Sequence, residues 1–372
     1  MHTPPHWHSR RTSSRVTRQP RLRWTALAVA IAAIATACGS ARTLEGPAAA
    51  IFDGECASEA DLRLTVYSGR TENLIQPVLD AFSCETGIEV AVRWGASTDL
   101  ALLLAEEGDR TAADVFLSRS PGPVGFLEGK GLLTTVDGDV LGLVSQENRS
   151  AEETWVGFTG RKRVLVYNLD NVASDELPAS VFDLTDERYR GRVAIPATNG
   201  SFVDWFTVFR DQHGTDVAAQ WLDDMVANDA RYYPNNRSIV EASGRGEIDM
   251  GLVNHYYQYQ VAEASGDDHR AANWDFDGDD IGSLLIVTAA TVTAASENTE
   301  TANDFIAYLL SESAQRYFSG ETLEYPLAAA VAPADVLPAL GGPEIGSINF
   351  DSLGDGFARS TEIIETSGIL NE

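Results

Sequence analysis

The chain has 372 residues and a formal net charge of −28, because 55 acidic residues outnumber 27 Lys and Arg. A surface this acidic argues against nucleic acid as a partner, since phosphate binding needs a basic surface. It also argues against electrostatic adhesion to anionic lipid as the means of holding the protein at a membrane. The length is enough for two domains of ordinary size.

The first segment is basic and then apolar. Six arginines and no acidic residue precede Cys38, and an apolar run from Trp24 to Ala37 leads up to it. This order is typical of a secretory signal peptide, and the run is shorter than the roughly 20 residues that span a bilayer. Residues 35–38, Ala-Thr-Ala-Cys, resemble the bacterial lipobox, whose cysteine becomes the lipidated first residue. We therefore expect a signal peptide over 1–37 and lipidation at Cys38, with ordinary cleavage beside an incidental cysteine as the alternative.

Two cysteines, Cys56 and Cys84, remain after Cys38. Cleavage would remove six positive charges and leave a net charge of −34. Two cysteines in an exported chain favour a disulfide. Metal ligation by this pair is the weaker interpretation, because no His or Cys cluster accompanies it and no HExxH spacing occurs.

The folded body is expected to follow a lipid-anchored tether over 38–60, whose Gly, Ser, Ala and Pro content is typical of a linker. Apolar spacing then predicts five elements: strands over 62–67, 88–93 and 113–116, a helix over 72–84, and a helix through 100–104. This βαβαβ order predicts a parallel sheet with right-handed crossovers.

A second cycle of elements begins near residue 163. The predicted elements are strands over 163–167, 191–196 and 248–253, helices over 202–213, near 221–225 and after 257, a return segment from 283, and a mostly helical stretch over 302–317. Two α/β lobes predict a ligand cleft, and ligands bind at the carboxyl ends of parallel strands. Three polar loops fall at such ends: 68–70, 198–201 and 254–257.

Six short motifs occur in order along this body: Leu64-Thr-Val-Tyr-Ser-Gly69, Ala113-Asp-Val-Phe116, Gly160-Arg-Lys-Arg-Val-Leu-Val-Tyr167, Gly246-Glu-Ile-Asp249, Asn254-His-Tyr-Tyr257 and Glu324-Tyr-Pro-Leu327. Together they resemble the bacterial ferric-ion-binding proteins, extracytoplasmic receptors of ABC-type iron importers. The resemblance implies an α/β, type II periplasmic-binding-protein fold, with two lobes, a hinge and a ligand cleft. Lobe 1 is expected to comprise 61–160 plus about 283–325, and lobe 2 161–282 plus about 326–372.

Tyr256 and Tyr257 are the candidate metal ligands. A phenol has a pKa near 10, so a phenolate at neutral pH requires a strong Lewis acid to displace the proton. Ferric iron is hard and accepts tyrosinate oxygen. An arbitrary Tyr-Tyr pair more often lines a core or a helix end, but this pair follows a predicted strand in the pattern above. We therefore interpret it as a pair of Fe(III) ligands.

Two phenolates leave coordination positions for an anion, and the resemblance implies carbonate, citrate or phosphate in this synergistic role. The candidate anion-binding residues lie at a predicted helix N-terminus, which favours anions, and at two matching family positions: Thr198, Asn199, Gly200, Ser201, Asn236 and Asn254. Plain helix capping by Asn199 or Ser201 is compatible with that role. Turn residues are the alternative for the other two asparagines.

The sequence departs from the family pattern at three ligand positions. Thr71 stands where relatives have His, Arg119 where they have Glu, and Phe202 where some have a third Tyr. A positive charge beside ferric iron is unfavourable unless an anion lies between them. We therefore expect Arg70 and Arg119 to face the cleft and hold that anion, with Thr71 nearby. His255 is expected to lie outside the ligand set.

The enzyme motifs G-x-S-x-G, P-loop and zincin are absent from the sequence, so an enzyme is not expected. The sequence predicts a monomeric lipoprotein on the outer face of the cell membrane, in the extracytoplasmic space. Its expected function is to capture ferric iron with an anion and deliver it to an ABC permease. The alternative is a receptor for an organic anion or for a ferric chelate such as ferric citrate.

Overall fold

A single mixed β-sheet organises the computed structural model, which describes residues 42–340 and 356–371. The strands follow the order β2-β1-β3-β9-β4-β7-β5-β6, and β8 and β10 also pair with β4. They are β1 (Arg63–Ser68), β2 (Glu89–Trp94), β3 (Val115–Ser118), β4 (Trp155–Asn168), β5 (Val193–Ile195), β6 (Arg231–Tyr232), β7 (Met250–Asn254), β8 (Ala271–Trp274), β9 (Leu285–Val292) and β10 (Tyr325–Pro326). The expected signal peptide and Cys38 lie outside the described residues.

Twelve α-helices are found in the part of the chain that the structure describes. They are α1 (Pro47–Ile51), α2 (Glu72–Thr86), α3 (Ser97–Glu107), α4 (Pro121–Glu128), α5 (Gly138–Leu141), α6 (Gly200–His213), α7 (Thr215–Ala227), α8 (Asn236–Gly244), α9 (Tyr256–Ser265), α10 (Thr299–Leu309), α11 (Glu312–Tyr317) and α12 (Gly356–Thr366). Within the described ranges, no helix is long and apolar enough to cross a membrane.

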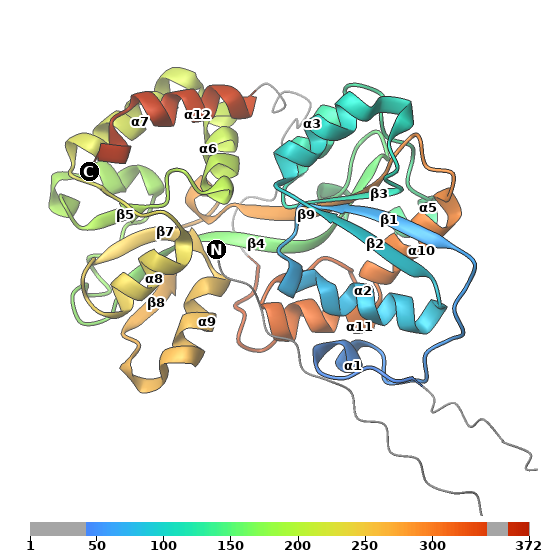
Figure 1. Cartoon of the computed structure of the whole chain (residues 1–372). Helices are drawn as coiled ribbons and strands as arrows, with labels where there is room; N and C mark the ends of the chain where they lie inside the picture. The colour runs from blue at the N-terminus through green and yellow to red at the C-terminus, as the bar shows by residue number, and fades with distance from the viewer. Residues whose placement is uncertain (1–41, 341–355, 372) are drawn as a thin grey trace, which may run out of the picture. The chain divides into compact units, whose positions relative to one another are not determined.

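Strand β4 is shared by the two lobes. Its first half, up to Lys162, pairs antiparallel with β9, and its second half, from Arg163, pairs with β7 and β8. Figure 1 shows β4 and β9 running between the lobes. The sheet therefore continues from one lobe to the other through a strand that is buried along nearly its whole length.

In lobe 1, β1, β2 and β3 pair in parallel, as their βαβαβ order predicts. Successive strand side chains point to opposite faces of a sheet. Leu64 and Val66 accordingly belong to the apolar core that contains the buried face of α2, whereas Tyr67 joins a second cluster with Leu100 and Leu104 of α3. Helices thus cover both faces of the sheet, which leaves its strand ends to form the ligand cleft.

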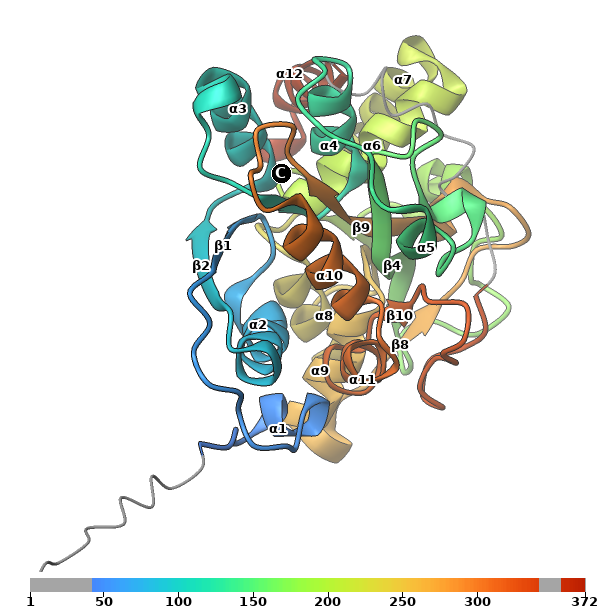
Figure 2. The ribbon, with the colours of Figure 1, turned by 90° about the vertical axis from the view of Figure 1, so that its right-hand side faces the viewer.

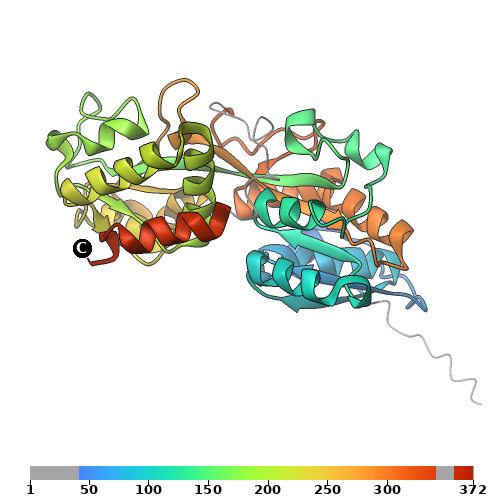
Figure 3. The ribbon, with the colours of Figure 1, turned by 90° about the horizontal axis from the view of Figure 1, so that it is seen from above.

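In lobe 2, α6, α7 and α12 lie together, and α8 and α9 pack beside each other against strands of the same sheet. Figure 3 shows the C-terminal helix alongside α6 and α7. The hydroxyl of Thr207 donates to Ser360 (2.9 Å), and Arg210 donates to the carbonyl of Gly356 (2.9 Å). The chain end is therefore an integral part of lobe 2.

The segment after β10 differs from its expected place in lobe 2. Pro326 pairs with Thr159 of β4, and the backbone N–H groups of Leu327 and Ala328 donate to Oε1 of Gln315 at 2.8 and 3.1 Å. These are contacts with lobe 1. The passage to α12 in lobe 2 falls within residues 341–355, outside the described residues.

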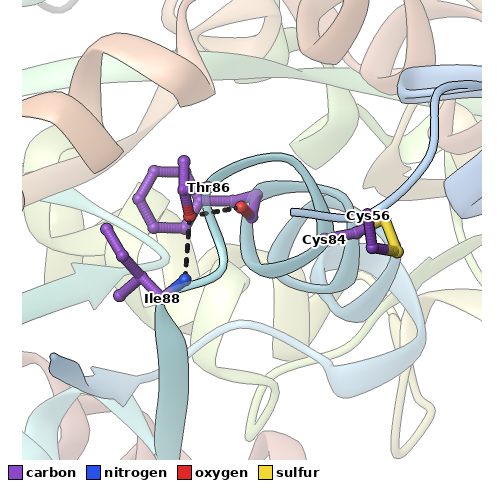
Figure 4. The surroundings of a disulfide bond; sticks show 5 residues. Cys56, Cys84, Thr86 and Ile88 are labelled. Carbon is purple, nitrogen blue, oxygen red and sulfur yellow. Dashed lines mark hydrogen bonds between the residues drawn. A yellow bond between two sulfur atoms is a disulfide. The ribbon is translucent and has the colours of Figure 1, made fainter. Parts of the chain in front are cut away.

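The N-terminal segment also differs from the expected tether. Helix α1 packs against α2 and α11, with Ala48 and Ile51 buried, as Figures 1 and 2 show. Cys56 and Cys84 form the expected disulfide, which joins this segment to α2 (Figure 4). The backbone N–H of Ala57 donates to the carbonyl of Cys84 at 2.8 Å. From residue 47 onward, this segment is part of the folded body.

Candidate metal and anion site

The tyrosine pair lies where β7 ends and α9 begins. The ring centroids of Tyr256 and Tyr257 are 4.4 Å apart, and the two ring planes are tilted by 35°. Burial raises the pKa of Tyr257, and the neighbouring Tyr256 raises it further, against the opposing charges of Arg161 and Arg119. Tyr257 is therefore a neutral phenol until a strong Lewis acid displaces its proton.

The pair lines a cleft of about 390 Å³ that receives residues from both lobes. Its lining comes from α1, from the loop and helix after β1, from α11 and its extension, and from α8 and α9: Pro47, Thr71, Asn73, Leu74, Arg237, Tyr256, Tyr257, Gln260, Glu263, Tyr317, Glu321 and Thr322. Thr71 is thus brought to the same cleft as the two tyrosines. It is the N-cap residue of α2 and is exposed.

The expected anion-binding asparagines converge around the start of α6. Oδ1 of Asn199 accepts from the backbone N–H of Ser201 (3.1 Å), which caps the helix that begins at Gly200. Nδ2 of Asn236 donates to Asn199 (3.1 Å), and its Oδ1 accepts from the backbone N–H of Asn254 (3.0 Å). One network therefore joins these residues.

The side chains of two members of the expected set lie outside this network. The hydroxyl of Thr198 is hydrogen-bonded to the hydroxyl of Tyr232 at 2.8 Å, at an exposed position. Asn254 is only 1% exposed, and its buried Oδ1 atom has no hydrogen-bond partner among the described residues. A buried acceptor left without a partner costs free energy, so this oxygen is suited to a cation or to a ligand that donates a hydrogen bond.

Two arginines that the sequence analysis did not single out, Arg161 and Arg163, contribute to the site. They lie on one face of β4 because they are two residues apart, while Lys162 points the other way and pairs with Asp275 at 2.9 Å. Arg163 is fully buried and donates to the carbonyl of Ser201 at 2.5 Å. Burial lowers the pKa of Arg163 to about 9, with the charge of Arg161 adding to the effect.

Arg119 reaches this cluster from lobe 1. Its Nε donates to the carbonyl of Gly69 (2.8 Å), and its own carbonyl accepts a hydrogen bond from Arg161. Burial lowers the pKa of Arg119, and Arg161 lowers it further. Within the described residues, its two terminal nitrogens have no hydrogen-bond partner, so both can receive an anion.

Arg70 has a different environment from the one expected for an anion-binding residue. Its two terminal nitrogens donate to Oε1 and Oε2 of Glu324 at 2.8 and 2.5 Å, and both side chains are almost fully buried. Burial acts to lower the pKa of Arg70, but the charge of Glu324 outweighs it and the pKa rises. Its charge is already balanced, whereas Arg119, Arg161 and Arg163 have no carboxylate within ion-pair distance among the described residues.

His255 and Phe202 supply no metal ligand. Nδ1 of His255 accepts from the backbone N–H of Lys162 (3.1 Å), and its Nε2 is 2.7 Å from the carbonyl of Leu323, so both ring nitrogens are used. Burial lowers the pKa of His255 to about 4. Phe202 is buried among aromatic rings of α6. Among the described residues, no three His, Cys, Asp or Glu side chains are grouped to hold a metal.

Comparison with known proteins assigns the family. Residues 110–352 match the bacterial extracellular solute-binding protein family. Iron-bound HitA from Pseudomonas aeruginosa has a similar structure, with a TM-score of 0.74 and 30% identity over 82% of this chain and 99% of that one. The chain belongs to the bacterial ferric-ion-binding proteins within this family.

Other members of the family are similar over most of their length. The Fe(3+)-binding periplasmic protein of Serratia marcescens is 26% identical over 322 residues, which covers 85% of this chain and 94% of the relative. The Trichodesmium protein IdiA (FutA), solved in complex with iron and citrate, has a TM-score of 0.71 and 26% identity over 82% of this chain and 99% of that one. The resemblance inferred from the six motifs is therefore confirmed, and with it the two-lobed type II fold.

Proposed function

We propose that this protein captures ferric iron outside the cytoplasm through Tyr256 and Tyr257 and delivers it to an ABC permease. The observation that carries the proposal is the pair of adjacent phenol rings after β7, in a cleft lined from both lobes. Ferric iron is acidic enough to ionise both phenols, and two phenolates then neutralise part of its charge. Similar proteins from Serratia and Pseudomonas are named for binding iron.

A synergistic anion completes the coordination in this proposal. Arg119, Arg161 and Arg163 supply positive charge that no carboxylate neutralises at ion-pair distance among the described residues. Carbonate, citrate and phosphate each have the oxygen atoms that such groups bind. The Glu324 partner of Arg70 makes that arginine a positioning residue for the β1–α2 loop and leaves anion binding to the other three.

Anchoring belongs to the same proposal. Lipidation of Cys38 would attach the exported protein to the outer face of the cell membrane. The strongly acidic surface is not attracted to anionic lipid, so attachment to the membrane requires such an anchor. We expect a monomer, with the permease as its protein partner. The proposed role is binding and transport without catalysis.

Titration of the purified iron-free protein with ferric salt tests the iron assignment, with and without bicarbonate or citrate. Phenolate-to-iron charge transfer should produce a visible absorption band. Tyr256→Phe and Tyr257→Phe should each weaken iron binding by about a hundredfold or more, and the double variant should stay colourless. Tyr259→Phe on the same helix is the matched control and should keep the band.

A colourless wild-type protein would overturn the iron proposal and favour the second candidate, a receptor for an organic anion. The arginine cluster is the observation that supports that candidate, because it carries charge suited to a carboxylate or phosphate ligand without a metal. Retention of a pre-formed ferric citrate complex, with no binding of ferric salt plus bicarbonate, would identify a chelate receptor.

A further inference from the structure

One carboxyl group lines the cleft from the lobe opposite the tyrosines. Glu321 lies in the π-helical turn Phe318–Thr322 that extends α11, and it lines the same cleft as Tyr256 and Tyr257. In Figure 1, α11 of lobe 1 and α9 of lobe 2 lie opposite each other. Among the described residues that line the cleft from lobe 1, only Glu321 carries a negative charge at neutral pH.

Contacts of the backbone and rings near Glu321 hold its segment against the start of α9. The carbonyl of Leu323, two residues after Glu321, lies 2.7 Å from Nε2 of His255. The ring centroid of Tyr325 is 4.9 Å from that of His255. Since His255 directly precedes Tyr256, the segment that carries Glu321 is fixed beside the tyrosine pair by contacts that do not involve its own side chain.

The other polar side chains of this wall are already used, whereas that of Glu321 is not. The hydroxyl of Thr322 donates to Oε2 of Glu324 at 3.1 Å, and Glu324 is the buried partner of Arg70. The hydroxyl of Tyr317 donates to a backbone carbonyl of α2 at 3.3 Å. Glu321 is exposed, and its carboxylate has neither a hydrogen-bond nor an ion-pair partner within the described ranges. This carboxylate is therefore free to bind a cation in the cleft.

Two phenolates leave one positive charge on a ferric ion unbalanced. The three arginines of the anion site balance the anion and repel the ion, so they do not remove this charge. Ferric iron is hard and prefers anionic oxygen ligands. The cleft has a second carboxylate, Glu263, but it lies on α9 six residues after Tyr257, about 9 Å further along the same helix. It belongs to the lobe of the tyrosines and cannot connect the two lobes, whereas Glu321 can.

We propose that Glu321 is a third protein ligand of the ferric ion and joins the two phenolates when the lobes close over it. The inference rests on the proposed capture of iron by Tyr256 and Tyr257. The carboxylate takes the place of a water molecule on the ion, and its charge balances the one that the phenolates leave. The ion then connects lobe 1 with lobe 2. Iron thereby favours the closed state, in which both lobes supply ligands, over the open state.

Glu321→Gln in the full-length protein, loaded with ferric salt and bicarbonate, tests the proposal. Replacing an anionic ligand by a neutral one makes the ferric ion a stronger electron acceptor, so the phenolate-to-iron band should move to longer wavelength. Iron should also dissociate into EDTA faster by about tenfold or more. Glu263→Gln removes the same charge from the same cleft and is the matched control, which should keep the position of the band. Both variants should unfold in urea like the wild-type protein, because both side chains are exposed.

Three results would overturn the assignment of Glu321. An unchanged band and an unchanged rate of iron dissociation in Glu321→Gln would show that the carboxylate does not reach the ion. Equally faster dissociation in Glu321→Gln and Glu263→Gln, with the band unmoved, would indicate a general effect of charge in the cleft. Faster dissociation with an unmoved band, reproduced by Arg237→Met, would make Glu321 an ion-pair partner of Arg237, which lines the cleft from α8.

Failure of the iron assignment itself gives a different result. A wild-type protein that stays colourless with ferric salt would overturn the capture of iron by the tyrosine pair, and the role of Glu321 with it. A coloured wild-type protein whose band is not altered in Glu321→Gln would overturn the role of Glu321 alone.

Discussion

At the scale of single residues, the site depends on which polar groups are already satisfied. His255 follows β7 directly and precedes both tyrosines, yet its two ring nitrogens contact backbone groups of β4 and of the segment before β10. It thereby fixes the start of α9 against both segments. The neutral imidazole is required for this arrangement, since Nδ1 must accept a hydrogen bond from Lys162.

The neutral state of His255 predicts a pH dependence of stability for the iron-free protein. Its pKa is about 4 in the folded state and near 6.5 when unfolded. The unfolded state therefore binds the proton first, and stability is lost as pH falls from about 6.5 to 4, by about 3 kcal/mol from this residue. Urea unfolding at a series of pH values measures this loss.

In His255→Asn, the unfolding free energy should fall less steeply over that pH window, although the variant is less stable at neutral pH because it loses a backbone hydrogen bond. His213→Asn, at the exposed end of α6, is the control and should retain the wild-type slope. Identical slopes for wild type and His255→Asn would contradict the assignment.

At the scale of secondary-structure elements, the sequence predicted most strands and helices, because their apolar residues recur at regular spacing. The predicted helix over 72–84 corresponds to α2, and the predicted strand over 248–253 to β7, each within about two residues. The tyrosine pair could be singled out as a candidate because it directly follows such a strand. Because side chains two positions apart in a strand lie on the same face, the spacing of Arg161 and Arg163 could also have identified them as neighbours.

Other features could not be predicted because they depend on contacts between distant segments. The first half of β4, which precedes the predicted strand over 163–167, is one such feature. It contains Gly157, where an added Cβ would lie 2.8 Å from the carbonyl oxygen of Asn148, so the close backbone approach requires glycine there. Such a strand is buried on both faces and shows little alternation. The pairing of Arg70 with Glu324 spans 254 positions in sequence, and no local pattern indicates it.

The disulfide attaches the N-terminal segment to α2. The bond between Cys56 and Cys84 closes a loop with a sequence separation of 28. Restricting the unfolded chain by a loop of this length stabilises the fold by about 3–4 kcal/mol. The double variant Cys56→Ser/Cys84→Ser should lose about this amount in chemical denaturation. If reduction of the wild-type protein leaves its unfolding free energy unchanged, the disulfide does not restrain the fold.

At the scale of the whole molecule, the N-terminal segment would link the proposed anchor to the cleft. Pro47 of α1 lines the same cleft as Tyr256 and Tyr257. It lies nine positions after Cys38, and an extended chain of that length spans at most about 30 Å. Lipidation at Cys38, as proposed, would therefore hold this wall of the cleft within about 30 Å of the membrane surface. The cleft would then lie close to the proposed permease in that membrane.

Helix α1 should therefore contribute to cargo retention as well as to stability. A chain that begins at residue 53 lacks α1 but keeps the disulfide, and a chain that begins at residue 42 is the matched control. Loss of the buried Ala48 and Ile51 side chains should lower the unfolding free energy by about 2–4 kcal/mol. Iron should also dissociate several-fold faster into a competing chelator, because one wall of the cleft is missing. The rate of iron dissociation from each of the two chains is measured from the decay of the charge-transfer band. Equal dissociation rates for the two chains, despite a stability difference, would show that α1 supports the fold without enclosing the cargo.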